Sequence, residues 1–178
     1  MRYKTYLTTN PTTRVTAGFP TYPSGGEHHG IDYVLSPDKT IRCISPGIVQ
    51  HAGWGTGANE SFGIYVSVKM ANGQIMYYAH MESKSVNTGM TVSNGDVLGI
   101  MGATGNVTGP HVHVALKSQE GAGNWIDPSG YTGIPNAVGT YETIYAGDEP
   151  PPDPPPSGDE NADAMIAIYA ALHKLGKI

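Results

Sequence analysis

The sequence predicts an all-β fold built from antiparallel sheets, and three observations support this prediction. Short apolar stretches separated by turn residues recur along the first 146 residues. Glycine supplies 24 of the 178 residues, which is about twice its usual share. Because these glycines follow no collagen-like period, most are expected in turns. No segment before residue 140 shows the period of an amphipathic helix.

The first part of the chain divides into a lead-in and a run of short strands. Residues 1–25 are rich in Thr and Pro and are expected to form an irregular N-terminal lead-in. Between Ile31 and Trp54, apolar stretches are broken by Ser36-Pro37-Asp38 and by Pro46-Gly47. This pattern predicts short strands joined by turns.

The clearest hairpin lies in the middle of the chain. Ile64–Met70 alternates apolar and polar residues, Asn72-Gly73 is a typical hairpin turn, and Gln74–Tyr78 returns. His80 is expected at the end of this return strand. Further short strands are predicted within 86–101 and at 112–116, the last entered from the glycine-rich loop 102–110.

The composition changes at Glu149, after a predicted domain of residues 26–146. Six of the fourteen prolines lie between Pro150 and Pro156, so residues 147–158 are expected to be a semi-rigid linker. Residues 159–178 begin with acidic and end with basic side chains and carry an apolar stripe, which predicts a short C-terminal amphipathic helix. This helix could contact a protein partner or a second copy of the chain.

The net charge and the apolar stretches of the sequence bear on its partners and its location. The net charge is −5 and no basic patch is evident, so nucleic acid is not an expected partner. Met1 is followed by no apolar stretch of signal-peptide type, and the longest apolar run, 165–172, is too short to span a membrane. The single cysteine, Cys43, is expected to be a buried thiol without a disulfide.

Histidines and an aspartate suggest a metal site. His28 and Asp32 are separated by an even number of residues, so in an extended chain they point the same way and could chelate one ion. The odd spacing from His29 to Asp32 makes His29 a poorer candidate. On a strand, His111 and His113 share one face, which suits a metal ligand beside a proton-handling group.

Together these residues suggest catalytic zinc. Two histidines and one aspartate form a three-ligand set that leaves one coordination position open. Further histidines, including His80, could transfer the protons that amide hydrolysis requires.

Three segments resemble the signatures of the M23 metallopeptidases, the LytM/lysostaphin-type peptidoglycan hydrolases. They are His28-x-Gly30-x-Asp32, Tyr78-Ala79-His80-Met81, and the run from Gly102 to His113 that contains Gly109-Pro110-His111-x-His113. The resemblance covers roughly residues 20–130. It implies the antiparallel β architecture of that family, with a groove for a peptide substrate.

The resemblance also implies roles for individual residues. His28, Asp32 and His113 would bind one Zn²⁺ per chain, and His80 and His111 would be the catalytic histidines. Tyr22 is the candidate for the tyrosine that assists the reaction. The expected activity is hydrolysis of an amide in peptidoglycan stem peptides or cross-bridges, with specificity set by loops at 55–62 and 119–125. The alternative is a zinc-containing wall-binding or assembly module without catalysis, which would be expected to lack some of these five histidine and aspartate residues.

The place of action follows from the expected substrate. The protein would act on the bacterial cell wall. Because no signal peptide is recognised, release by lysis or carriage on a virus particle is expected, as in a bacteriophage lysin or a tail-associated wall hydrolase. A piece of a longer exported protein would have the same sequence features.

Overall fold

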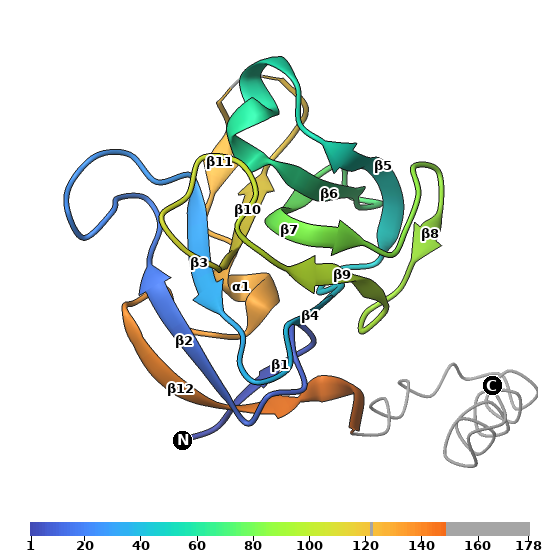
Figure 1. Ribbon diagram of the computed structural model, residues 1–178. Helices are drawn as coiled ribbons and strands as arrows, with labels where there is room; N and C mark the ends of the chain where they lie inside the picture. The colour runs from blue at the N-terminus through green and yellow to red at the C-terminus, as the bar shows by residue number, and fades with distance from the viewer. Residues whose placement is uncertain (122, 149–178) are drawn as a thin grey trace, which may run out of the picture. The chain divides into compact units, whose positions relative to one another are not determined.

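The computed structural model describes residues 1–121 and 123–148, and residues 1–145 form one folded unit (Figure 1). Its strands are β1 (Tyr3–Thr5), β2 (Thr12–Ala17), β3 (Gly30–Val34), β4 (Thr40–Arg42), β5 (Gly47–Trp54), β6 (Ile64–Lys69), β7 (Ile75–Lys84), β8 (Thr91–Val92), β9 (Val97–Met101), β10 (Val112–Lys117), β11 (Trp125–Ile126) and β12 (Gly139–Tyr145). The helices are short: η1 (Gly57–Phe62), α1 (Ser129–Thr132) and η2 (Ala146–Asp148).

The predicted all-β fold is confirmed. The described strands form one sheet, whose main path runs β1-β12-β2-β3-β10-β7-β6-β5-β8. All pairs are antiparallel except β1 with β12. Strand β10 lies between β3 and β7, as Figure 1 shows.

The core lies on one face of the central strands. Val112, Val114 and Leu116 alternate along β10 and are fully buried in the main apolar cluster. Residues between them point to the opposite face because strand side chains alternate. On that second face Ala115 belongs to a smaller cluster with Tyr65 and Tyr77. The alternation therefore separates a packed core from a face that can carry polar groups.

The predicted hairpin is present, but its return strand is longer than expected. Strands β6 and β7 pair through a turn at Asn72 and Gly73, where Gly73 has φ of 85°. The expectation that His80 ends the return strand is wrong, because β7 continues to Lys84. His80 has φ of 63°, and beyond it the strand pairs with β9. This left-handed residue bends β7, so that its first half pairs with β6 and β10 and its second half pairs with β9.

The expectation of an irregular lead-in over residues 1–25 differs from the structure. Strand β1 pairs with β12, and β2 pairs with both β12 and β3. Thr13, Val15 and Ala17 are buried at every second position of β2. Threonine counts as a polar residue, so the buried Thr13 hid the alternation of apolar and polar positions, although threonine has high strand propensity. The folded unit therefore begins before residue 26.

The remaining sequence predictions concern the C-terminal region and Cys43. Cys43 is fully buried and free, as expected. Most of the predicted linker at 147–158 and all of the predicted helix at 159–178 lie outside the described residues. Within the described part of the chain, no helix has the length and apolar character needed to cross a membrane.

Candidate metal centre and active site

Three side chains converge beside the central strands. His28 lies in the loop before β3, Asp32 lies on β3, and His113 lies on β10 directly opposite Asp32. His28 Nε2 is 3.1 Å from Asp32 Oδ1 and 3.1 Å from His113 Nδ1, and His113 Nδ1 is 2.9 Å from Asp32 Oδ1. All three residues are buried. Among the described residues this is the one group of three such side chains close enough to hold a metal ion.

His28 presents one ring nitrogen to the other two ligands. Its Nδ1 lies 2.7 Å from the Gly18 carbonyl oxygen. A carbonyl only accepts hydrogen bonds, so Nδ1 carries a proton and Nε2 is the ring atom that faces Asp32 and His113. Nε2 is therefore the ring nitrogen that can bind a metal ion beside the Asp32 carboxylate, 3.1 Å away.

The spacing and chemistry of the donors suit zinc. Ligands placed tetrahedrally around zinc at 2.0–2.1 Å lie about 3.3 Å from one another, and the observed separations are 2.9–3.1 Å. Two imidazoles and one carboxylate match the three-ligand sets of catalytic zinc sites. The carbonyl of Gly18 also fixes the orientation of the His28 ring, as partners of metal-bound histidines commonly do.

The charge state of the site also favours a cation. Burial alone would raise the pKa of Asp32, but the surrounding histidines outweigh it and hold the pKa well below its ordinary value. Burial lowers the pKa of His113, although Asp32 opposes this effect. At neutral pH the centre therefore holds a carboxylate and an uncharged His113, which is the protonation state that metal binding requires.

Two further imidazoles stand beside the metal ligands. His80 Nδ1 lies 2.9 Å from the Thr104 carbonyl, and His111 Nδ1 lies 2.9 Å from the Gly109 carbonyl. In both rings Nδ1 is therefore the donor, so Nε2 is the ring atom left for contacts with a substrate or water. The two ring centroids are 4.8 Å apart, and His111 Nε2 is 3.6 Å from Asp32 Oδ1.

The loop before β10 holds these histidines in place. The amide of Gly102 donates to the His80 carbonyl, and the amide of His111 donates to the Gly102 carbonyl. The Thr104 hydroxyl donates to the Met81 carbonyl. Burial lowers the pKa of His80 to about 4, although its bond to Thr104 opposes this shift. His80 is therefore neutral at neutral pH.

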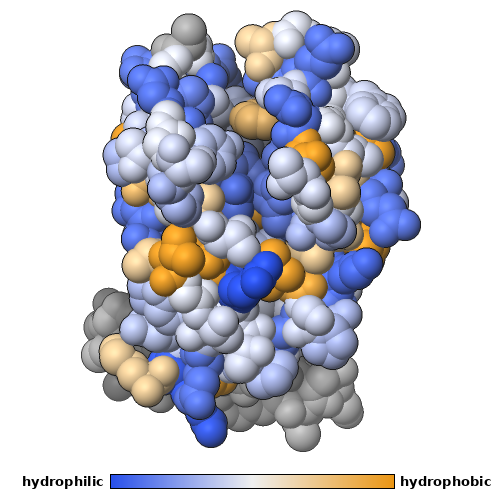
Figure 2. Space-filling view, turned by 60° about the vertical axis from the view of Figure 1, so that its left-hand side comes forward, coloured by the Kyte–Doolittle hydropathy of each residue, from blue (hydrophilic) through white to orange (hydrophobic). Residues whose placement is uncertain are grey.

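Tyr22 lies against one of the metal ligands. Its ring stacks on the His28 ring with centroids 4.0 Å apart. Tyr33 on β3 and Tyr78 on β7 are fully buried in the main core. Tyr22 also lines a cavity of about 400 Å³ with Asp32 and His111. Figure 2 shows that this face of the molecule is hollowed by a cleft between two walls.

The protein-family comparison decides the classification. The model of peptidase family M23 matches residues 26–128, which is more than half of the chain. This chain belongs to peptidase family M23.

The M23 chain is similar to several characterised wall enzymes. It is 36% identical over 86 residues to the peptidoglycan DD-endopeptidase ShyC of Vibrio cholerae, covering 48% of this chain and 19% of ShyC. It is 32% identical over 100 residues to the glycyl-glycine endopeptidase ALE-1 of Staphylococcus capitis, covering 54% of this chain and 27% of ALE-1. The chain thus spans about a fifth to a quarter of the length of these relatives.

A solved structure supports the fold of this M23 domain. The catalytic domain of lysostaphin from Staphylococcus simulans superposes with a TM-score of 0.60 and 27% sequence identity. The superposition covers 67% of this chain and 91% of the lysostaphin domain. The similarity therefore extends over nearly the whole catalytic domain of that protein.

Other histidines of the M23 chain lie apart from the metal ligands. His29 is half-exposed and stacks on Trp125, with ring centroids 5.4 Å apart and planes within 10°. The spacing argument that favoured His28 over His29 therefore agrees with the geometry. His51 stacks on Tyr65 with centroids 4.1 Å apart. His173 lies outside the described residues.

Sequence reasoning missed two residues that shape the M23 site. A side-chain carbon at Gly30 would lie 2.4 Å from the Val114 carbonyl oxygen and 2.8 Å from His113 Cε1. Gly30 therefore leaves room for the His113 ring. Phe62 lies 5.6 Å from the ring of His113 and 6.5 Å from that of His80, measured between centroids. Its place at the end of the 55–62 loop was the one available signal.

Proposed function

We propose that this chain is a zinc-dependent endopeptidase that hydrolyses an amide bond in peptidoglycan stem peptides or cross-bridges. The observation that carries the proposal is the convergence of His28, Asp32 and His113 beside two imidazoles whose Nδ1 atoms are held by backbone carbonyls. The family and the names of the relatives, a peptidoglycan DD-endopeptidase and a glycyl-glycine endopeptidase, support the choice of substrate. One zinc ion per chain would be held by the three buried ligands.

The proposed chemistry divides between the ion and the chain. Bound zinc supplies a Lewis acid that polarises the scissile carbonyl. His111 directs Nε2 toward the metal ligands and takes the proton of the attacking water as general base. The proton then passes to the leaving amine nitrogen as the C–N bond breaks, which yields a carboxylate and an amine.

His80 and Tyr22 have supporting roles in this proposal. His80 is neutral, with Nδ1–H held by Thr104, so its Nε2 accepts a hydrogen bond from the water or from the leaving amine and orients it. Burial, with a smaller contribution from Asp32, raises the pKa of Tyr22. The Tyr22 hydroxyl therefore keeps its proton and can donate to the developing oxyanion.

The proposal is tested by digestion of purified cell walls of both cross-link types. Wild type is compared with His113→Ala and His111→Ala, fragments are identified by mass spectrometry, and bound zinc is measured. We expect cleavage by wild type only, with zinc lost in His113→Ala and retained in His111→Ala. His29→Ala is the matched control and should keep both activity and zinc. Zinc binding by wild type without cleavage of either wall would instead indicate the wall-binding module.

The route to the wall and the binding partners stay predictions from the sequence. Release by lysis or carriage on a virus particle would bring such an enzyme to peptidoglycan. Binding of a protein partner, or of a second copy, is predicted for residues 159–178, which lie outside the described residues.

A further inference from the structure

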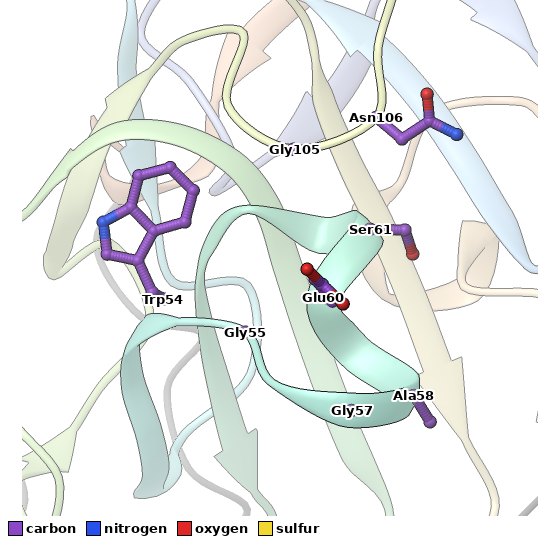
Figure 3. A pocket seen from close by; sticks show the side chains of 8 residues that line it. All are labelled: Trp54, Gly55, Gly57, Ala58, Glu60, Ser61, Gly105 and Asn106. Carbon is purple, nitrogen blue, oxygen red and sulfur yellow. The ribbon is translucent and has the colours of Figure 1, made fainter.

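A second cavity lies beside the catalytic one. It has a volume of about 850 Å³ and lies between the segment 54–61, which includes most of η1, and the loop that contains Asn106 (Figure 3). Asn106 lines both this cavity and the one that contains Asp32 and His111. The two cavities therefore adjoin at Asn106, within reach of one extended peptide.

The second cavity carries one formal charge. Glu60 is the sole charged side chain among the residues that line it, and no Lys or Arg is present there. Within residues 1–121 and 123–148, the Glu60 carboxylate has no hydrogen bond or ion pair with another side chain. In Figure 3 it lies between the indole of Trp54 on one side and the side chains of Ser61 and Asn106 on the other.

The uncharged residues that line the second cavity suit a cationic group, as the Glu60 carboxylate does. Trp54 is 62% exposed although it is a large aromatic residue at the end of β5. An indole face attracts an organic cation when the cation lies within about 6 Å of the ring. Ser61 and Asn106 add side-chain oxygens that can accept hydrogen bonds from an ammonium group. A carboxylate beside an exposed aromatic face is a combination that favours a primary ammonium and disfavours a carboxylate.

We infer that this cavity binds a primary ammonium group of the peptide whose amide lies at the metal site. The inference rests on the proposed function and adds a determinant of specificity to it. Two sources share this chemistry: the side-chain amine of a diamino acid in the stem peptide, and the free N-terminal amine of a cross-bridge. Glu60 and Trp54 would contribute to substrate binding but take no part in bond cleavage.

Binding is measured on a zinc-loaded protein that cannot hydrolyse the ligand. His111→Ala serves as the background, and Glu60→Gln and Glu60→Lys are each added to it. Three peptides of the same sequence are compared by calorimetry: one with a free side-chain amine, one with a free N-terminal amine, and one with both amines acetylated. We expect Glu60→Gln to weaken binding of one amine-bearing peptide about five- to tenfold, and Glu60→Lys to weaken it further.

The controls separate this inference from the proposed function. The acetylated peptide should bind equally well to all variants, and Glu142→Gln, which removes an exposed carboxylate on β12, should change nothing. The peptide that responds identifies the source of the amine. Equal effects of Glu60→Gln on all three peptides, or no effect on any, would overturn the inference. Failure of the proposed function would appear separately, as wild-type protein that binds zinc and peptide but hydrolyses nothing.

Discussion

His113 lies directly opposite Asp32 in the antiparallel pair of β10 and β3, and its Nδ1 is 2.9 Å from Asp32 Oδ1. Two of the three metal ligands are thus positioned by backbone hydrogen bonds of the sheet. The third, His28, is oriented by its bond to the Gly18 carbonyl. None of these restraints depends on an ion, so the ligand set is arranged before metal binds.

Replacing the one anionic ligand should weaken metal binding strongly. Asp32→Asn keeps the shape of the side chain but removes the charge that balances the cation. We expect zinc affinity to fall by at least about 100-fold, measured by competition with a chromophoric chelator. His29→Ala should leave the affinity unchanged. An Asp32→Asn protein that retains the wild-type affinity would show that the ion binds elsewhere.

Adding a single methyl group beside His113 should also disturb the metal site. In Gly30→Ala the new carbon meets the Val114 carbonyl and the His113 ring at less than 3 Å. We expect zinc affinity to fall about tenfold or more although every ligand is present, with a loss of stability of about 1–3 kcal/mol from overpacking. Gly130→Ala is the matched control, because nothing lies within 4 Å of its new carbon. Equal zinc affinities for wild type and Gly30→Ala would refute this role.

The backbone at His80 should show strain when the imidazole is removed. His80 has φ of 63°, a conformation that costs non-glycine residues about 1–2 kcal/mol. His80→Gly and His80→Ala both remove the side chain, but only glycine relieves this cost. We expect His80→Gly to be the more stable by about 1 kcal/mol, measured by urea unfolding. His80→Ala being as stable as His80→Gly would contradict the prediction.

Stability of the metal-free protein should fall in mildly acidic solution. Burial lowers the pKa of His80 to about 4 in the folded state, against about 6.5 in an unfolded chain. The unfolded state therefore binds the proton first, so this contribution to stability is present above pH 6.5 and is lost as the pH falls toward 4. The loss is expected to reach about 3 kcal/mol at most.

The measurement for this pH effect is chemical unfolding between pH 7.5 and 4 in the presence of a chelator. His80→Asn is the matched variant, since asparagine tolerates the left-handed conformation and does not titrate. Its stability should depend less on pH over this range. Parallel pH profiles for wild type and His80→Asn would assign the effect to other groups.

The hydroxyl of Tyr22 should matter for turnover and not for metal binding. Tyr22→Phe keeps the ring that stacks on His28 and removes the donor. We expect kcat to fall about 10- to 100-fold, with KM and zinc affinity nearly unchanged. An unaltered kcat would remove Tyr22 from the proposed reaction.

Much of the site could be predicted from the sequence because its residues lie in short segments with recognisable spacing. Even spacing places His28 with Asp32, and the three signature segments bring in His80 and His111. The left-handed conformation of His80 and the close packing at Gly30 depend on strands far away in the sequence, so no local pattern indicates them. The lead-in strand β2 was missed for a related reason, since its one buried threonine, Thr13, lies in a strand that pairs with β12 and β3.

The central position of β10 has a consequence for how such a chain can diverge. Its neighbours β3 and β7 carry Asp32 and His80, and pairing with them aligns His113 with Asp32 and Ala79. Insertion or deletion of one residue within β10 would exchange the two faces of the strand, sending His113 into the core and a valine to the metal. These three strands can therefore tolerate substitutions but not changes of length. The surface loops around the cleft are under no such restriction, and new substrate preferences can arise there by insertion.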